Sequence, residues 1–132
     1  LPHGIANALV LTEVMRYNSA EVPTKMGTFS QYQYPHTLAR YAEIGRFVGL
    51  TGKNDQEVFE KLLAKLEDLM RTIEIKPTIK DYGVDEKYFL DTLDDMVGQA
   101  FNDQCTGANP RYPLMSELKE IYLKAYYGTE NK

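Results

Sequence analysis

The stretch from Asn54 to Ile73 reads NDQEVFEKLLAKLEDLMRTI and carries the clearest structural pattern in the chain. Its apolar residues recur at spacings of three and four: Val58, Phe59, Leu62, Leu63, Leu66, Leu69, Met70 and Ile73. This period places them on one face of an amphipathic α-helix. Asn54 and Glu57 have the spacing of an N-cap and its third-position partner, and Pro77 is expected to close the far end.

Helical patterns continue on both sides of this stretch. A second helix is predicted near residues 36–48, ending at Gly49. Downstream, a short turn at 79–82 is expected to stop at Gly83, and Asp85 is the expected N-cap of a fourth helix. A fifth helix is expected to begin at Pro113 and end at Gly128. Their apolar stripes are Leu38, Tyr41, Ala42, Gly45 and Val48; Phe89, Leu90, Leu93, Met96, Val97, Ala100 and Phe101; and Leu114, Leu118, Ile121, Tyr122 and Ala125.

The first helix has a different pattern. Residues 5–15 are apolar around the whole helix circumference, which predicts a position in the middle of the domain, with fraying around residues 17–19. No segment alternates like a strand. We therefore predict an all-α fold, a bundle of about five helices that forms a single domain over residues 1–132.

Two segments outside the helices carry weaker signals. The connection from Glu21 to Pro35 holds Phe29, Tyr32 and Tyr34, aromatic residues that we expect to pin it to the surface rather than to form the wall of a site. The polar tail at 129–132 is expected to be disordered.

Composition excludes several classes of protein. The 132 residues are 43% hydrophobic and 26% charged, and no stretch reaches the roughly 20 apolar residues of a membrane span. A net charge of -4 with interspersed Lys and Arg argues against nonspecific nucleic-acid binding. The single cysteine, Cys105, excludes an internal disulfide framework and favours a reducing compartment, so we expect a cytoplasmic protein. The start, Leu1-Pro2-His3, has neither the basic n-region of a secretory signal nor an initiating methionine, so we expect that further polypeptide was cut away upstream.

His3 is the first candidate for a chemical role. It opens the apolar first helix in the sequence Leu1-Pro2-His3-Gly4, where an interior helix has little structural need for an imidazole. The ordinary alternative is a helix-entry residue whose ring caps backbone or meets solvent. His36 has no Cys, Asp or Glu at ligand spacing and is interpreted as structural. Two histidines and one cysteine do not complete a metal site, so a metal bound through His3 needs ligands from outside this sequence.

The segment DQCTGANPR at 103–111 is the second candidate. Such a loop of small residues between two helices can line a pocket; the alternative is a helix-to-helix turn in which Gly107 takes a positive φ. Cys105 has no adjacent base, so a small buried hydrophobe is favoured over a nucleophile. The acidic residues on the predicted helices are interpreted as solvated faces: Glu60, Glu67, Asp68, Asp91, Asp94 and Asp95.

Two motifs, PHGIANAL at 2–9 and CTGANPR at 105–111, resemble the iron-dependent (group III) alcohol dehydrogenase family. The intervening stretches FSQY at 29–32, RYAEI at 40–44 and AFNDQC at 100–105 are similar to one branch, the alcohol dehydrogenase half of bifunctional aldehyde–alcohol dehydrogenases. The resemblance covers essentially the whole chain in order.

The resemblance implies a site shared between two domains. Family members pair an N-terminal dinucleotide-binding domain with a C-terminal all-helical domain, and the active site lies in the cleft between them. A divalent iron, replaceable by zinc, is held there by one aspartate and three histidines. His3 matches the last of these ligands, and the other three are expected upstream of this chain. Cys105 matches a pocket-lining position, whereas Asn109 and Arg111 match family positions with no assigned role.

The implied function is that of an NAD-dependent alcohol dehydrogenase, which interconverts acetaldehyde and ethanol with Fe(II) as Lewis acid. The expected partners are the upstream dinucleotide-binding domain, a small alcohol or aldehyde, and further copies in an oligomer or filament, with no nucleic acid or membrane. The isolated chain is expected to fold but to be inactive. The alternative is a helical scaffold or filament-assembly module, and glycerol dehydrogenases and dehydroquinate synthases are weaker alternatives among enzymes.

Overall fold

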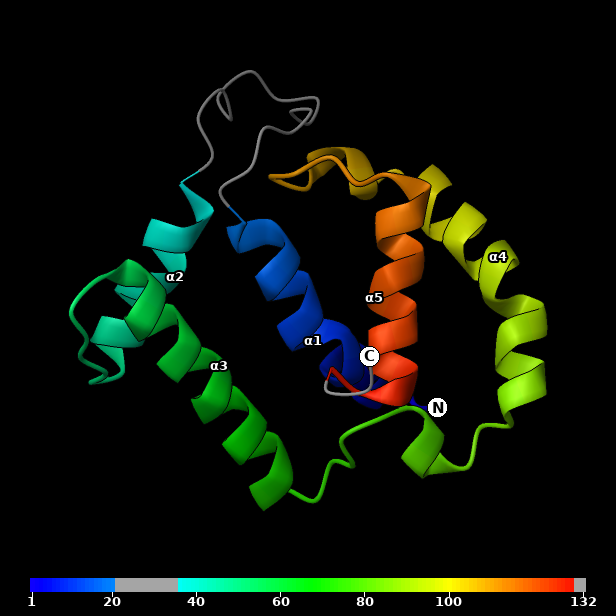
Figure 1. Ribbon diagram of the computed structural model, residues 1–132, viewed down its shortest axis with the longest axis horizontal. Coiled ribbons are helices and arrows are strands. Elements are labelled where there is room, and N and C mark those ends of the chain that lie inside the picture. The colour runs from blue at the N-terminus through cyan, green and yellow to red at the C-terminus, as the bar shows by residue number, and fades with distance from the viewer. Residues whose placement is uncertain (21–35, 130–132) are drawn as a thin grey trace.

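The computed structural model describes residues 1–20 and 36–129, which form five α-helices, two short 3-10 helices and no strand (Figure 1). The predicted all-α fold is confirmed. The predictions for the connection at 21–35 and for residues 130–132 lie outside the described residues. Thr129, which was expected to be disordered with the tail, is described and donates its hydroxyl to Glu13 at 2.8 Å. None of the described helices is long and apolar enough to cross a membrane. The elements are α1 (His3–Ser19), α2 (Thr37–Phe47), α3 (Asp55–Thr72), η2 (Lys80–Tyr82), α4 (Glu86–Asn102), η3 (Thr106–Ala108) and α5 (Met115–Tyr127).

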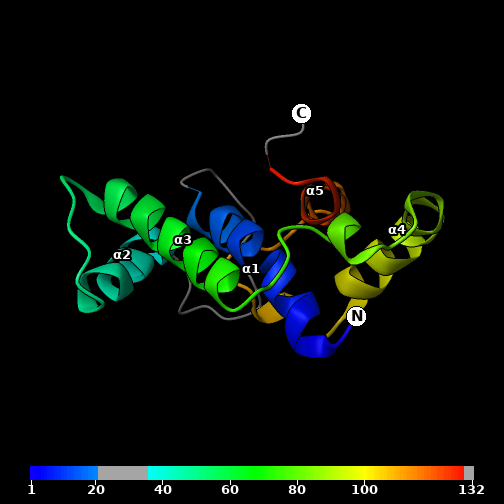
Figure 2. The same cartoon turned by 90° about the horizontal axis from the view of Figure 1, so that it is seen from below.

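Helix α1 lies in the middle of the fold, as predicted. It contacts α2 and α3 on one side and α5 on the other, and Figure 2 shows these two groups of helices on opposite sides of it. The hydrophobic core accordingly has two parts. Met15 of α1 packs with Phe59, Leu62 and Leu63 of α3, and α4 packs against α5 through Phe89, Leu93, Val97 and Tyr126.

The far end of α1 is not frayed, which corrects the prediction for residues 17–19. Asn18 and Ser19 are buried, Tyr17 donates a hydrogen bond to Glu117 in the first turn of α5, and Asn18 donates one to Asn109 in the segment before α5. Burial around the helix is also less complete than its composition predicts, since Leu11 is 39% exposed.

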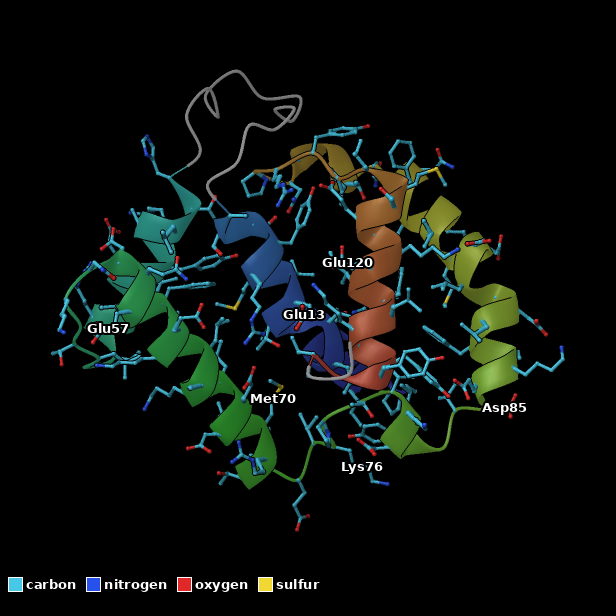
Figure 3. All side chains as sticks on the ribbon, viewed as in Figure 1. Glu13, Glu57, Met70, Lys76, Asp85 and Glu120 are labelled. Carbon is cyan, nitrogen blue, oxygen red and sulfur yellow. The ribbon has the colours of Figure 1, made fainter. Side chains whose placement is uncertain are left out.

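Capping fixes the starts of α3 and α4, where Figure 3 labels Glu57 and Asp85. The side chain of Asn54 accepts a hydrogen bond from the backbone N–H of Glu57 at 2.9 Å, and Asp85 accepts one from Tyr88 at 2.9 Å. Both predicted N-caps are confirmed.

Two predicted helix boundaries are wrong. Helix α3 ends at Thr72, well before Pro77, because Glu74 adopts a φ of 62° and the N–H of Ile75 bonds back to the carbonyl of Met70 at 2.8 Å. Helix α5 begins at Met115 rather than Pro113, because the carboxylate of Glu117 accepts the N–H of Leu114 at 2.8 Å and the helix starts after that residue.

The predicted stripes identify the packed faces but overestimate their length. Val48, Leu69, Ile73 and Leu90 lie at or near the ends of their stripes and are exposed. Gly45 marks the close contact of α2 with α3, since a Cβ there would lie 2.7 Å from Cγ1 of Val58.

Candidate functional site

His3 is the first residue of α1 and is exposed. Pro2, with extended backbone, precedes it, and the carbonyl of Pro2 accepts the N–H of Ala6 at 3.0 Å, so the backbone around the imidazole belongs to the first helical turn. The Nε2 atom of His3 lies 3.1 Å from the amide Nδ2 of Asn7, one turn along the helix. Pro2, the N-cap residue, makes no side-chain capping hydrogen bond at this end of α1.

A single imidazole fits one position of a metal coordination shell. Within residues 1–20 and 36–129, no group of three or more His, Cys, Asp or Glu side chains is arranged to hold a metal ion. A neutral histidine nitrogen is a ligand for Fe(II) or Zn(II), and its exposure leaves it accessible to groups from elsewhere. The donor set of the described chain therefore fits a shared metal site and does not complete one.

Cys105 is exposed, so the interpretation as a buried hydrophobe is wrong. It precedes η3, and its backbone N–H donates to the carboxylate of Asp103 at 2.7 Å. Gly107 lies inside this 3-10 turn and is not among the glycines with positive φ. Cys105 lines a cavity of about 260 Å³ with side chains of α1 and α5, including Val14 and Ile121.

His3 and Cys105 do not share one site in the described chain. The cavity at Cys105 is lined by Val14, Tyr17 and Asn18 of α1, near the C-terminal end of that helix. A rise of about 1.5 Å per residue places these positions about 17–22 Å along the helix axis from His3. The structure thus brings Cys105 beside the far end of the helix that His3 begins.

The structure shows what Asn109 and Arg111 contact. Asn109 and Asn18 exchange amide hydrogen bonds at 2.7 and 3.2 Å. The guanidinium of Arg111 donates to the backbone carbonyl of Tyr17 at 2.9 Å and to Oε1 of Glu117 at 2.9 Å, and it lies 3.9 Å from the centre of the Tyr17 ring. Its Nε atom is buried and has no hydrogen-bond partner among the described residues. Both side chains therefore anchor the segment before α5 to the end of α1.

Glu117 is the acceptor at the centre of these contacts. Besides Arg111, it accepts the hydroxyl of Tyr17 at 2.7 Å and the backbone N–H of Leu114 at 2.8 Å. Burial by itself raises the pKa of Glu117, but these hydrogen bonds and the charge of Arg111 outweigh it, so the pKa lies below the ordinary value. The pKa of Tyr17 is raised, first by burial and then by its hydrogen bond to Glu117. Near neutral pH the cluster therefore holds a carboxylate, a guanidinium and a neutral phenol.

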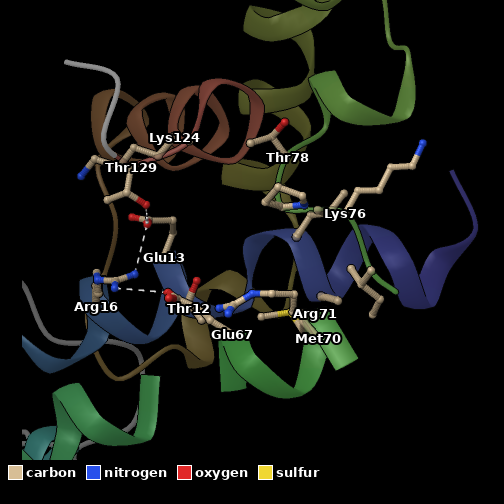
Figure 4. Close-up of a pocket in the computed structure, with 15 residues that line it drawn as sticks. Thr12, Glu13, Arg16, Glu67, Met70, Arg71, Lys76, Thr78, Lys124 and Thr129 are labelled. Atoms are coloured by element: carbon tan, nitrogen blue, oxygen red, sulfur yellow. Dashed lines mark hydrogen bonds and ion pairs between the residues drawn. The ribbon is translucent and has the colours of Figure 1, made fainter. Parts of the chain in front are cut away.

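Glu13 forms a second polar cluster, which sequence analysis missed. It is 5% exposed, accepts the hydroxyl of Thr129 at 2.8 Å and pairs with Arg16 at 3.3 Å, and Arg16 reaches Glu67 of α3 at 3.4 Å (Figure 4). This cluster lines a cavity of about 420 Å³ between α1, α3 and the end of α5. The sequence signal for it was an acidic residue in the mostly apolar stretch of α1, since a buried carboxylate needs a partner.

Comparisons with known proteins place this geometry in a family. The model of the Fe-containing alcohol dehydrogenase family, C-terminal, matches residues 1–126. The chain is 50% identical over 132 residues to the bifunctional aldehyde-alcohol dehydrogenase AdhE of Escherichia coli K12 and 44% identical over 126 residues to the aldehyde-alcohol dehydrogenase of Clostridium acetobutylicum. These alignments cover 98% and 96% of this chain but 15% of each relative.

A solved structure agrees with these relatives. The iron-containing alcohol dehydrogenase of Thermococcus thioreducens matches with a TM-score of 0.77 and 29% identity, over 97% of this chain and 29% of that one. The helices, the match over residues 1–126 and the similarity along nearly the whole chain agree with one another. This chain belongs to the Fe-containing alcohol dehydrogenase family and corresponds to its C-terminal part.

Proposed function

We propose that this chain is the metal-binding helical part of an NAD-dependent alcohol dehydrogenase that interconverts acetaldehyde and ethanol. The observation that carries the proposal is the exposed imidazole of His3 at the start of α1, in a chain that belongs to an iron-containing family. When bound, a divalent cation such as Fe(II) or Zn(II) supplies Lewis-acid chemistry at the substrate oxygen. Polypeptide upstream of Leu1 would bind NAD and would supply the other three side chains that coordinate the metal.

The role of this chain's own residues is to place one neutral nitrogen. His3 lies in the first turn of α1, whose buried residues Leu9 and Met15 pack within the fold. The opposite end of α1 is tied to the segment before α5 by Asn109 and Arg111. Because α1 is held at its middle and at its far end, the backbone that carries the imidazole has a fixed position, as a metal ligand requires.

The substrate-pocket role of Cys105 is a separate proposal. The cavity beside Cys105 supports a lining role, but its distance from His3 requires a pocket that extends along α1. In the complete enzyme, Cys105→Ala should raise the KM for acetaldehyde and leave the iron content unchanged. An unchanged KM would contradict it.

Two variants of the complete enzyme test the ligand proposal. His3→Ala should lower iron content and turnover together. His36→Ala is the matched control, because His36 is exposed at the start of α2, outside the proposed ligand set, and should keep both. Full iron occupancy with unchanged turnover in His3→Ala would contradict the ligand role.

The isolated chain gives an independent test. We expect one folded helical domain over residues 1–132 that neither oxidises NADH in the presence of acetaldehyde nor binds iron tightly, because three ligands and the nucleotide-binding part lie elsewhere. Measurable NADH oxidation by the purified chain would contradict this.

The free thiol of Cys105 supports a reducing, cytoplasmic location.

A second candidate function is assembly of a homo-oligomer or filament without catalysis by this part. Exposed apolar residues near the end of α2 favour it: Phe47 is 91% exposed and lies beside the exposed Ile44 and Val48. Light scattering of the complete protein, compared with Phe47→Ser, tests this role. A smaller assembly with unchanged iron content would support it, whereas an unchanged assembly would count against it.

A further inference from the structure

The first turn of α1 contains one side-chain pair that involves the proposed ligand. Residues three and four positions apart lie on the same face of a helix, and Asn7 follows His3 by four. The amide Nδ2 of Asn7 lies 3.1 Å from Nε2 of His3, and both residues are exposed. Within the described chain, this amide is the ring's side-chain hydrogen-bond partner. A Cβ added at Gly4 would meet no neighbouring atom within 4 Å, so there is open space beside this turn of the helix.

The chemistry of the two groups fixes the direction of their hydrogen bond. An amide nitrogen donates and does not accept, so Nε2 of His3 accepts. In the neutral ring, the proton is then on Nδ1, and Nε2 presents a lone pair. A metal binds a histidine nitrogen only when that nitrogen is unprotonated. The contact therefore selects the tautomer in which Nε2 is ready to bind a cation.

We infer that Asn7 is a positioning residue for His3. Its amide favours the tautomer in which Nε2 is unprotonated, and a divalent cation would take the place of the amide hydrogen at that nitrogen. The inference rests on the proposed function, because it gives a role to the tautomer only if His3 is a ligand. It concerns the metal-free state, so it is measured without iron or turnover.

The test is a tautomer measurement on the 132-residue chain labelled with ¹⁵N at histidine. Long-range ¹H–¹⁵N spectra, recorded about two pH units above the ordinary histidine pKa of about 6.5, show which ring nitrogen carries the proton. We expect the Nδ1–H population of His3, relative to Nε2–H, to be about twofold higher in the wild type than in Asn7→Ala, as expected for an exposed pair one turn apart. His36 serves as the internal control and should not change in any variant.

Two further variants separate the hydrogen bond from a general effect on the helix. Asn7→Gln keeps an amide donor and should restore the wild-type tautomer ratio in part. Asn7→Asp offers only acceptor oxygens and should shift the ring toward Nε2–H. Equal ratios in wild type and Asn7→Ala, or the same ratio in wild type and Asn7→Asp, would overturn the inference.

The failure of this inference and the failure of the proposed function are distinguishable. The tautomer ratio tests the contact between Asn7 and His3, whereas the iron content of His3→Ala in the complete enzyme tests the ligand role. Normal iron in His3→Ala would overturn a metal-related role for Asn7 even if the tautomer ratio behaved as expected. Lost iron together with the expected ratios would support both.

Discussion

Replacing Arg111 by methionine tests how strongly the segment before α5 is tied to α1. Methionine keeps much of the side-chain length but removes the guanidinium. That group donates to the carbonyl of Tyr17 and to the carboxylate of Glu117, and it covers the Tyr17 ring. The side chains of Arg111 and Glu117 are 15% and 26% exposed, so solvent screens their ion pair only in part. We therefore expect Arg111→Met to lower the free energy of unfolding.

The expected change in the free energy of unfolding is the loss of the Arg111 contacts less the gain from removing its buried Nε–H group. A hydrogen bond between charged groups contributes about 1.5–3 kcal/mol, and one to a carbonyl about 1 kcal/mol. A partly desolvated cation–π contact adds about 1 kcal/mol. The substitution also removes the buried Nε–H, which has no partner among the described residues and costs about 1–3 kcal/mol. The difference predicts a net loss of about 2 kcal/mol.

The loss should depend on pH in a defined direction. The pKa of Glu117 lies below its ordinary value in the folded chain, so folding favours the carboxylate. Such a group stabilises the fold above its unfolded-state pKa, about 4.3, and its contribution is lost as the pH falls through the lower, folded-state value. The difference between wild type and Arg111→Met should therefore be constant near neutral pH and shrink below about pH 4.3.

Urea unfolding followed by far-ultraviolet circular dichroism measures these free energies at each pH. Arg71→Met is the matched control, because Arg71 pairs with Asp68 while both side chains are more than 70% exposed, at 73% and 74%. That variant should lose no more than about 0.5 kcal/mol. A loss for Arg111→Met as small as that of the control, or a loss that does not change with pH, would refute the reasoning.

Three further predictions concern stability and use the same unfolding assay. Gly45→Ala should lower the free energy of unfolding by about 1 kcal/mol, because the added Cβ meets α3 at 2.7 Å. Gly98→Ala, whose Cβ meets no atom within 4 Å, should raise that free energy by about 0.5–1 kcal/mol. Effects of the same sign would contradict the packing of α2 on α3. Tyr17→Phe should lower the free energy of unfolding by about 1 kcal/mol at neutral pH. The raised pKa of Tyr17 stabilises the fold below the unfolded-state pKa, and this contribution is lost as the pH rises through the folded-state pKa, so the difference from wild type should shrink above about pH 10. A difference that persists at high pH would count against the hydrogen bond. Asn54→Ala and Asp85→Ala should each cost about 1 kcal/mol through the lost N-cap, and wild-type stability in either variant would show that the cap is dispensable.

The helices were predictable where their determinants are local. The N-caps Asn54 and Asp85 contact residues three positions away, so the spacing in the sequence predicts the bond in the structure. The start of α5 was not predicted, because Leu114 offers no capping side chain and Pro113 is a common first residue of helices. The deciding contact there is the carboxylate of Glu117, which accepts the N–H of Leu114. Periodicity also predicts which face of a helix is apolar but not how far a neighbour covers it, so the exposure of Leu69 came only from the structure.

The polar clusters could not be predicted, because their partners are far apart in the sequence. Tyr17 and Glu117 are separated by 100 residues, and Asn18 and Asn109 by 91. Tyrosine and asparagine at the end of a helix are typical of fraying when only neighbours are considered. The same residues form ordered contacts once the segment before α5 lies beside them.

The two motifs that carried the family resemblance meet on one helix. The first begins α1 with His3, and the second holds the opposite end of α1 through Asn109 and Arg111. Four residues of this far end and of the second motif form hydrogen bonds within the chain, whereas among the described residues the side chain of His3 bonds to the neighbouring Asn7. The part of α1 that the second motif contacts lies about 17–22 Å along the helix axis from His3, so the two motifs are linked through α1 and do not lie side by side. Fixing one end of a rigid helix determines where its other end lies, so under the proposed ligand role of His3 the second motif would act by holding α1 in place rather than by contact with the metal.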